Sequence, residues 1–127
     1  MTKPLLLFPN PAVYTRDRLR ELITAPDVTV STKPTTGADE ARPRPYIQVM
    51  PLGGDTLRGI RAVESVRLLV NDPDEGHAYN LAELARALLV ASGVALASSS
   101  ARPTLNTDPD TGEPLATVDL DVVTAPS

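Results

Sequence analysis

The sequence predicts an α+β fold in which a small mixed, mainly antiparallel β-sheet of about five strands carries two helices packed on it. The clearest strand is Leu115–Val123, where apolar and polar residues alternate with the period of a strand that has one buried face. Tyr46–Met50 and Ala62–Asn71 show the same alternation, and a glycine-containing connection joins them, which is typical of an antiparallel pair. Apolar residues at helical spacing between Pro73 and Ser92 add a helix.

The length and composition indicate a single domain, 1–127. A chain of 127 residues has the usual size of one domain. We divide it into an N-terminal extension (1–9), a long loop (33–45) and a closing hairpin (103–124), with the other elements between them. Because the chain has one Phe, three Tyr and no Trp, its core has to be built from Leu, Val, Ile and Ala.

The charge balance and the cysteine content argue against several classes of protein. The net charge is −4, and the basic residues are scattered without a stripe of basic and aromatic side chains, which disfavours nucleic-acid binding. The absence of cysteine excludes a disulfide scaffold and a thiolate zinc site. No apolar run approaches the length that spans a membrane, so we expect a soluble protein made in a cytoplasm.

The first third of the chain is predicted to form a helix, a short strand and a long loop. Asn10 and Pro11 are suited to a cap and a first helical residue, and we expect the helix to end at Ala25, before the next proline. Val28–Thr32 is a short β-rich run. Lys33–Pro45 is poor in apolar residues and long for a compact domain, and such loops are usually functional or mobile.

The two central strands are predicted to be separated by a connection. Tyr46–Met50 is expected to stop at Pro51 and the glycines that follow it, because proline and paired glycines interrupt strands. Asp55–Arg61 is then the connection, and Ala62–Asn71 is the second strand.

The helix from Pro73 to Ser92 has the clearest sequence signals. Asp72 is predicted as its cap, Pro73 as its first residue and Glu75 as an acidic residue three positions after the cap. Gly93 is expected to end it. Residues at positions i, i+3, i+4, i+7 and i+8 are predicted to form one buried stripe, namely Leu81, Leu84, Ala85, Leu88 and Leu89.

The C-terminal part is predicted to be a hairpin that completes the sheet. Val94–Arg102 is rich in small residues and is predicted as a weak strand, the first arm of the hairpin. Asn106–Pro114 is dense in Asp, Pro, Gly and Asn, which is typical of a turn. In the second arm, Leu115–Val123, the buried side is expected to consist of Ala116, Val118, Leu120 and Val122.

The acidic turn before the last strand is the strongest enzymatic candidate. Asn106, Asp108 and Asp110 match positions 1, 3 and 5 of a calcium-binding loop. The match fails at position 6, where Thr111 replaces the required Gly, and at position 12, where Thr117 replaces the required Glu. The residues therefore favour a hairpin turn over a metal site.

The remaining polar residues give no catalytic constellation. Asp119 and Asp121 share one face of a strand, which more often marks the solvent side than a metal site. His77 is the only histidine, and no G-x-S-x-G surrounds any serine. We therefore assign no catalytic, cofactor or metal residue and expect a protein that is not an enzyme. A small metal-dependent enzyme that uses Asp108, Asp110, Asp119 and Asp121 stays open as an alternative.

The order of the predicted elements and one motif resemble a known family. A helical start and a Pro/Arg loop precede the strands around Tyr46–Val49 and Ser65–Val70, an acidic-capped helix follows, and the turn D-P-D-T-G-E-P (Asp108–Pro114) precedes the alternating final strand. This arrangement, over about Pro11–Thr124, resembles the tail terminator proteins of long-tailed (siphovirus-type) bacteriophages. The chain departs from that family at the start of the final strand, where an aromatic residue is common and Leu115 and Ala116 stand here.

The resemblance implies a virion structural protein rather than an enzyme. Tail terminators form a homohexameric ring on the last ring of the major tail tube protein, end tube polymerisation and present a docking face to the head-closure or neck protein. DNA only passes through the lumen, and neither a membrane nor a cofactor takes part. The resemblance thus places the protein in the virion tail, at the head–tail junction, after assembly in the host cytoplasm.

The long loop and the acidic turn are the candidate contact regions of such a ring, because they are long and polar. The candidate interface residues are Thr35, Asp39, Arg42, Arg44, Asp108, Asp110 and Glu113. The alternatives within the structural class are another neck or minor tail protein of the head-closure type, and an accessory domain that binds a protein partner without forming rings. Binding at the tube end or at the portal side separates a terminator from a head-closure protein.

Overall fold

The computed structural model describes residues 10–34, 36–37, 40–41, 45–58, 61–97, 101–109 and 112–124. Its elements are α1 (Pro11–Leu22), β1 (Thr29–Ser31), β2 (Thr36–Gly37), β3 (Glu40–Ala41), β4 (Tyr46–Arg58), β5 (Arg61–Asn71), α2 (Glu75–Ala91), β6 (Thr104–Thr107) and β7 (Pro114–Thr124). Five strands form one sheet in the order β1-β4-β5-β7-β6, while β2 and β3 form a separate ribbon. The pair β1–β4 is parallel and the other three pairs of the main sheet are antiparallel. The predicted fold class is confirmed.

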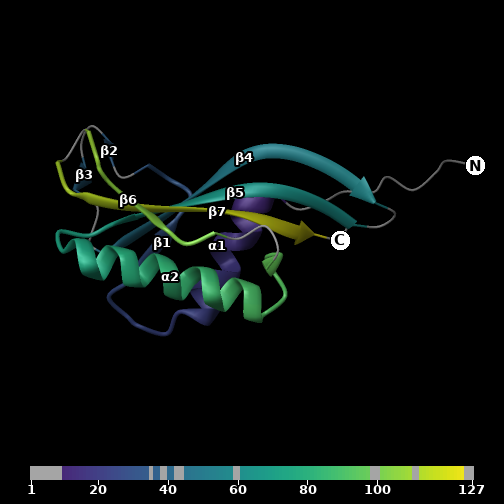
Figure 1. Cartoon of the computed structure of the whole chain (residues 1–127), viewed down its shortest axis with the longest axis horizontal. Coiled ribbons are helices and arrows are strands. Elements are labelled where there is room, and N and C mark those ends of the chain that lie inside the picture. Colours follow the sequence, from purple (N-terminus) through teal and green to yellow (C-terminus); the bar gives the residue numbers. More distant parts are fainter. Residues whose placement is uncertain are drawn as a thin grey trace, which may run out of the picture.

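The molecule has two layers, with both helices on one face of the sheet (Figure 1). α2 packs mainly on β7 and β5, and α1 packs on β4. The side chains between the layers are aliphatic, as the composition required, and the completely buried ones include Leu19, Ile47, Val49, Leu68, Leu89 and Leu120. The opposite face of the sheet is not covered by a helix in the described part of the chain, and the β2–β3 ribbon lies on that side (Figure 1).

Both helices begin at side-chain caps; the start of α1 is as predicted, whereas its end and the start of α2 differ from the sequence prediction. The Oδ1 atom of Asn10 accepts hydrogen bonds from the N–H groups of Ala12 (2.9 Å) and Val13 (3.3 Å), as expected of an N-cap. α1 ends at Leu22 rather than at Ala25, because the next residue already has an extended backbone. α2 is capped by Asp74, which places its start two residues after the predicted one.

The buried stripe of α2 differs from the predicted one. Its buried residues are Ala78, Leu81, Ala82, Ala85 and Leu89. Leu84 is 49 % exposed and Leu88 is half-buried, so the prediction was wrong for Leu84. The three alanines at the centre of the contact let α2 lie close to the sheet, and this rotates Leu84 out of the core.

β4 is longer than predicted, because it passes through Pro51 and the glycines to Arg58. Its pairing with β5 shifts between Pro51 and Gly53 and again between Gly53 and Thr56, with one extra β4 residue each time. These are β-bulges, and Gly53 has the positive φ of 90° that suits glycine. The prediction that the strand stops at Pro51 was wrong, because bulges absorb the residues that a regular ladder rejects.

Pro51 lies where its missing N–H group disrupts no ladder. The N–H of Thr29 donates to the carbonyl of Pro45 (3.1 Å), so that carbonyl faces β1. Because main-chain groups of alternate residues point to the same side, those of Pro51 also face away from β5. β1 pairs only as far as Gln48, so among the described residues Pro51 stands on an unpaired edge of the sheet.

The closing hairpin uses a different first arm from the one predicted. Thr104–Thr107 forms β6 and pairs with Pro114–Thr117, whereas in the described residues 94–97 and 101–102 only Ala95 forms a bridge, to Val122. These described residues have no alternating apolar side chains to bury, which explains why they do not form a strand. The second arm, β7, is confirmed, and its predicted buried side is buried throughout: Ala116, Val118, Leu120 and Val122.

Candidate functional site

A hollow of about 310 Å³ lies beside β7, where the start of β6 leaves the sheet edge. We name it the edge groove. Its lining residues are Arg67, Ala101, Arg102, Thr104, Thr117, Val118 and Asp119. This volume is at the lower end of the range of roughly 300–1,000 Å³ that ligand pockets have. The edge groove is therefore sized for a side chain or a short segment rather than for a large cofactor.

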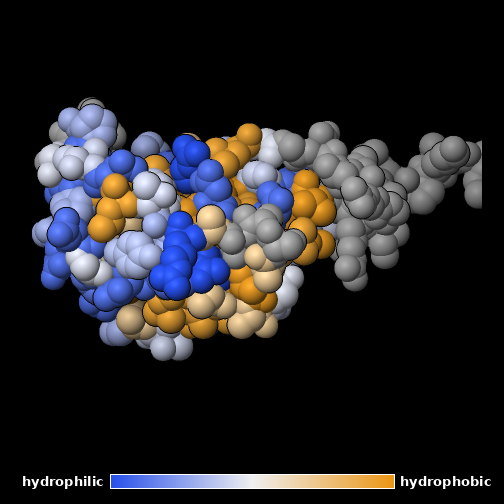
Figure 2. Space-filling model, in the orientation of Figure 1, coloured by the Kyte–Doolittle hydropathy of each residue, from blue (hydrophilic) through white to orange (hydrophobic). Residues whose placement is uncertain are grey.

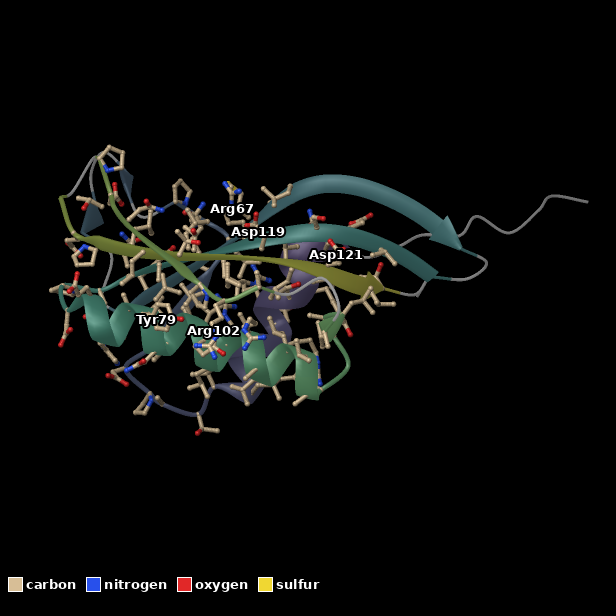
Figure 3. The ribbon with its side chains drawn as sticks, viewed as in Figure 1. Arg67, Tyr79, Arg102, Asp119 and Asp121 are labelled. Atoms are coloured by element: carbon tan, nitrogen blue, oxygen red, sulfur yellow. The ribbon has the colours of Figure 1, made fainter. Side chains whose placement is uncertain are left out.

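One wall of the edge groove is an ion pair between neighbouring strands. Arg67 of β5 lies directly opposite Asp119 of β7 in the antiparallel register. Its Nε and Nη2 atoms donate to the two carboxylate oxygens of Asp119 at 2.8 and 3.1 Å (Figure 3). This hydrogen bonding, and then the attraction between the charges, raises the pKa of Arg67 above its ordinary value. The pair is thus balanced in charge.

The floor of the edge groove includes a stretch of β7 that lacks a strand neighbour. β6 pairs with β7 up to Thr117, and the bridge of Ala95 is at Val122. Leu96 N–H donates to the Asp121 carbonyl at 2.9 Å, so the main chain of Asp121 faces this side. By strand alternation the main chain of Asp119 faces it too. In the residues that the structure describes, nothing pairs with that main chain.

Near the edge groove, the charge of Arg102 acts on an ion pair of α2. Arg86 of α2 donates to Glu83, with one bond of 3.1 Å from its Nε. The hydrogen bond from Arg86 is the main cause that lowers the pKa of Glu83; partial burial opposes it, and the charges of Arg86 and then Arg102 add to the lowering. The same hydrogen bond raises the pKa of Arg86.

Arg102 supplies the charge that is not balanced. It is exposed, and it has no hydrogen bond or ion pair with the other described residues, only the longer-range attraction to Glu83. Figure 3 places it over α2, near Tyr79. The edge groove thus combines a neutralised Arg67, hydroxyl groups of Thr104 and Thr117, and one uncompensated cation.

The acidic turn before β7 does not present all its carboxylates to solvent. Asp108 was named as a candidate interface residue, but its side chain is not on the surface, because the residue is only 6 % exposed. The Nδ2 group of Asn71, which is 1 % exposed, donates to Asp108 Oδ2 at 3.0 Å. Asp108 N–H donates to the Glu113 carbonyl and Gly112 N–H to the Asp108 carbonyl, each at 2.8 Å, and these bonds close the turn. The burial arises because the turn folds back on the end of β5.

The other candidate interface residues divide into two groups. Glu113 is half-buried in the same turn. Five of the predicted residues lie outside the described residues: Thr35, Asp39, Arg42, Arg44 and Asp110. The structure therefore brings only Asp108 and Glu113 of the predicted set together.

The described carboxylates that a small metal-dependent enzyme would use each bind a different partner. Asp119 binds Arg67, and Asp121 accepts a hydrogen bond of 2.7 Å from the hydroxyl of Ser65. Asp108 binds Asn71. In the described part of the chain, no group of three or more His, Asp or Glu side chains is placed to hold a metal ion.

The side chain of His77, the single histidine, is about half-exposed. Its Nδ1 atom lies 2.7 Å from Asp72 Oδ2, and the other oxygen of Asp72 accepts from the N–H of Asp74 at 2.8 Å. The arrangement organises the start of α2 and brings no serine hydroxyl to the imidazole among the described residues.

Two surfaces on opposite sides of the fold are left partly exposed by the described residues. The first, the α2 stripe, consists of the exposed Leu84, Ala87 and Ala91 and of Leu88, which is half-buried and packs partly against the core. Figure 2 shows orange and pale-orange atoms along the lower rim, where α2 runs in Figure 1. The second, the open sheet face, consists of Gln48, Met50, Arg67, Leu69, Thr117 and Asp119, which share the side of the sheet away from the helices.

Sequence reasoning missed Arg67 and Arg102. The signal for Arg67 was present, because oppositely charged residues at outward positions of two strands indicate a cross-strand pair. It required the register of β5 against β7, which the sequence does not state. Arg102 had no signal beyond its place before a proline.

In comparisons with known proteins, no family model and no curated protein sequence matches the chain. In the described residues, no helix is long and apolar enough to cross a membrane. The functional argument therefore depends on the sequence motif and on the surfaces described above.

Proposed function

We propose that this protein is a tail terminator of a long-tailed bacteriophage, a structural protein that caps the tail tube as a ring, ends tube polymerisation and offers a docking face to the head-closure protein. The sequence support is the turn Asp108–Pro114 followed by the alternating strand that became β7. The structural observation that carries the proposal is the presence of two unlike uncovered surfaces on opposite sides of one small domain.

A closed ring needs two such surfaces on every subunit. Ring interfaces are heterologous, so the patch that a subunit offers to one neighbour differs from the patch it offers to the other. The α2 stripe is apolar, whereas the open sheet face mixes Met50 and Leu69 with the ion pair of Arg67 and Asp119. An isologous dimer would use one surface twice and would leave the other uncovered.

The exposure of the α2 stripe favours a protein contact. Leu84 is the most exposed of the large apolar side chains in the described residues, at 49 %. Exposed leucines alone are common on monomers, but here Ala87 and Ala91 extend the apolar surface along two further turns without a charged residue on the stripe. Small side chains permit close approach by a neighbouring backbone.

The decisive experiment is assembly of the cognate tube protein in the presence of the purified chain. We expect tubes of limited length with a ring at one end in negative-stain electron micrographs. Open-ended growth to the length seen without the chain would rule the proposal out. Binding to the portal side instead of the tube end would assign the protein to the head-closure type.

A charged residue in the α2 stripe provides the matched test. Leu84→Glu should weaken capping about tenfold or more, because the carboxylate would be desolvated in the interface. The control is Val13→Glu, which alters an exposed apolar residue of α1 at 36 % exposure. If Leu84→Glu caps as well as the control does, the α2 stripe is not an interface.

A further inference from the structure

We propose that the edge groove is a carboxylate-binding site, and that its occupant is the acidic start of α2, Asp74 and Glu75, of a second copy of this chain. The inference rests on the proposed function, because the second copy is the next subunit of the ring. It assigns a contact to residues outside the long loop and the acidic turn. The argument begins with the charges of the described residues.

Most charged side chains in the described residues already have a partner. Arg16 pairs with Asp17, Arg18 with Glu21, Arg67 with Asp119 and Arg86 with Glu83. Arg20 donates to the carbonyl of Val30 at 2.9 Å. Arg102, unlike these, has no hydrogen bond or ion pair with another residue whose side chain the structure describes, and it stands at the wall of a 310 Å³ hollow.

The complementary surface is the start of α2. Glu75 is exposed and has no hydrogen bond or ion pair with another described residue. Asp74 beside it is also exposed and uses Oδ1 to cap the helix. Two exposed carboxylates outweigh the partial positive charge of about 0.5 that a helix N-terminus carries. Asp27, an exposed carboxylate that also has no partner among the described side chains, stands alone and makes a weaker patch.

The edge groove offers more than charge to a carboxylate. Thr104 and Thr117 bring hydroxyl donors to the same hollow as the guanidinium of Arg102. A carboxylate that reaches Arg102 can accept two parallel N–H bonds, the geometry that makes arginine–carboxylate pairs specific. Asp119 does not repel it strongly, because Arg67 already neutralises that side chain.

The two patches lie on different parts of the chain, so the contact is heterologous. The acidic patch is at the first turn of α2, and Arg102 precedes β6. Each copy can therefore bind one neighbour through the edge groove and another through Asp74 and Glu75 at the start of α2. Such a contact repeats from copy to copy, which is the property that a ring requires.

Disulfide trapping tests the contact directly, because the chain has no cysteine of its own. Glu75→Cys and Arg102→Cys variants are mixed in equal amounts, oxidised with and without the cognate tube protein, and analysed by intact mass. We expect the mixed dimer to exceed both self-dimers. The control mixture is Glu75→Cys with Arg18→Cys, which places the second thiol at a partly exposed arginine of α1. Mixed dimer no more abundant than in the control, under both conditions, would overturn the inference.

Charge reversal separates failure of this inference from failure of the proposed function. Arg102→Glu and Glu75→Arg should each shift half-maximal capping to about tenfold higher protein concentration, and the double variant should recover it, because the pair is then reversed but complementary. If the wild type caps tubes and both single variants cap equally well, the edge groove is not the contact, but the function stands. If the wild type does not cap tubes, the function fails, and the trapping result alone decides the contact.

Discussion

Two of the side-chain pairs that join β5 to the closing hairpin differ in burial and in charge. At the end of β5, Asn71 donates to Asp108, and both side chains are buried. Further back along β5, Arg67 binds Asp119 at the surface, where the side chains are 39 % and 53 % exposed. In both pairs a β5 donor holds a carboxylate from the hairpin.

The difference in burial indicates what each carboxylate contributes to the fold. A buried donor that is left without its acceptor costs about 1–3 kcal/mol, whereas an exposed ion pair contributes only roughly 0.2–1 kcal/mol. Asp108 therefore fixes the turn against the end of β5. Asp119 contributes little to stability, and its pair with Arg67 instead sets the charge of the edge groove.

The largest expected effect is at the buried pair. Asp108→Ala should lower the free energy of unfolding by about 1–3 kcal/mol, because the amide of Asn71 loses its acceptor in a place without water. Urea denaturation measures it, with Asp119→Ala as the matched exposed change. A loss no greater than that of Asp119→Ala would show that burial does not distinguish the two pairs.

An intermediate effect is expected at Ser65, which is half-buried and donates to Asp121 at 2.7 Å. Ser65→Ala should lower the free energy of unfolding by roughly 0.5–1.5 kcal/mol, the usual contribution of one hydrogen bond. The measurement is again urea denaturation, and Ser92→Ala, which removes a hydroxyl bonded to the Leu89 carbonyl at the end of α2, is the control. An effect larger than that of Asp108→Ala would contradict the ranking by burial.

A smaller effect is expected at Arg67. Arg67→Met keeps the aliphatic stem and removes the ion pair, so the loss of stability should stay below about 1 kcal/mol. In roughly 1 M salt, where the screening length is about 3 Å, the difference between wild type and variant should shrink further. A loss that is large and independent of salt would mean that the pair behaves as a buried one.

The smallest effect is a pH dependence at Glu83. Its pKa in the folded protein lies below the ordinary 4.5, so its stabilising contribution is present above that pH and is lost as the pH falls through the folded pKa. Because the side chain is 34 % exposed, we expect no more than roughly 0.2–0.5 kcal/mol, as for an (i, i+3) helix pair. Glu83→Gln should remove this acid-dependent part, and urea denaturation at several pH values between about 3 and 7 measures it. The same acid slope in wild type and variant would contradict the assignment.

The elements with strong periodicity were predictable from sequence. The alternation of β5 and β7 and the capped start of α2 depend on local patterns, and these patterns determined the fold class. Irregular elements were not predictable in the same way. β4 continues through Pro51 because a bulge and the free edge tolerate it. The part of β4 after Pro51 and the short β6 therefore leave no periodic signal in the sequence.

The candidate site was less predictable than the fold. Whether Asp108 lies on a tip or inside depends on its distance from Asn71, 37 residues earlier in the chain. The edge groove depends on the β5–β7 register and on the place where β6 joins the sheet. The burial of Asp108 and the edge groove both arise from tertiary contacts, which a local pattern of charges does not specify.

Pro51 and the bulges after it also affect the tendency of the protein to aggregate through the free edge of β4. An unpaired strand edge is a template on which other chains add strands and grow into fibrils. Here the edge beyond β1 carries a residue without an N–H group and a strand whose register breaks twice, so a passing strand finds no regular ladder to extend. We therefore expect the protein to resist edge-to-edge aggregation through this part of β4 even at high concentration.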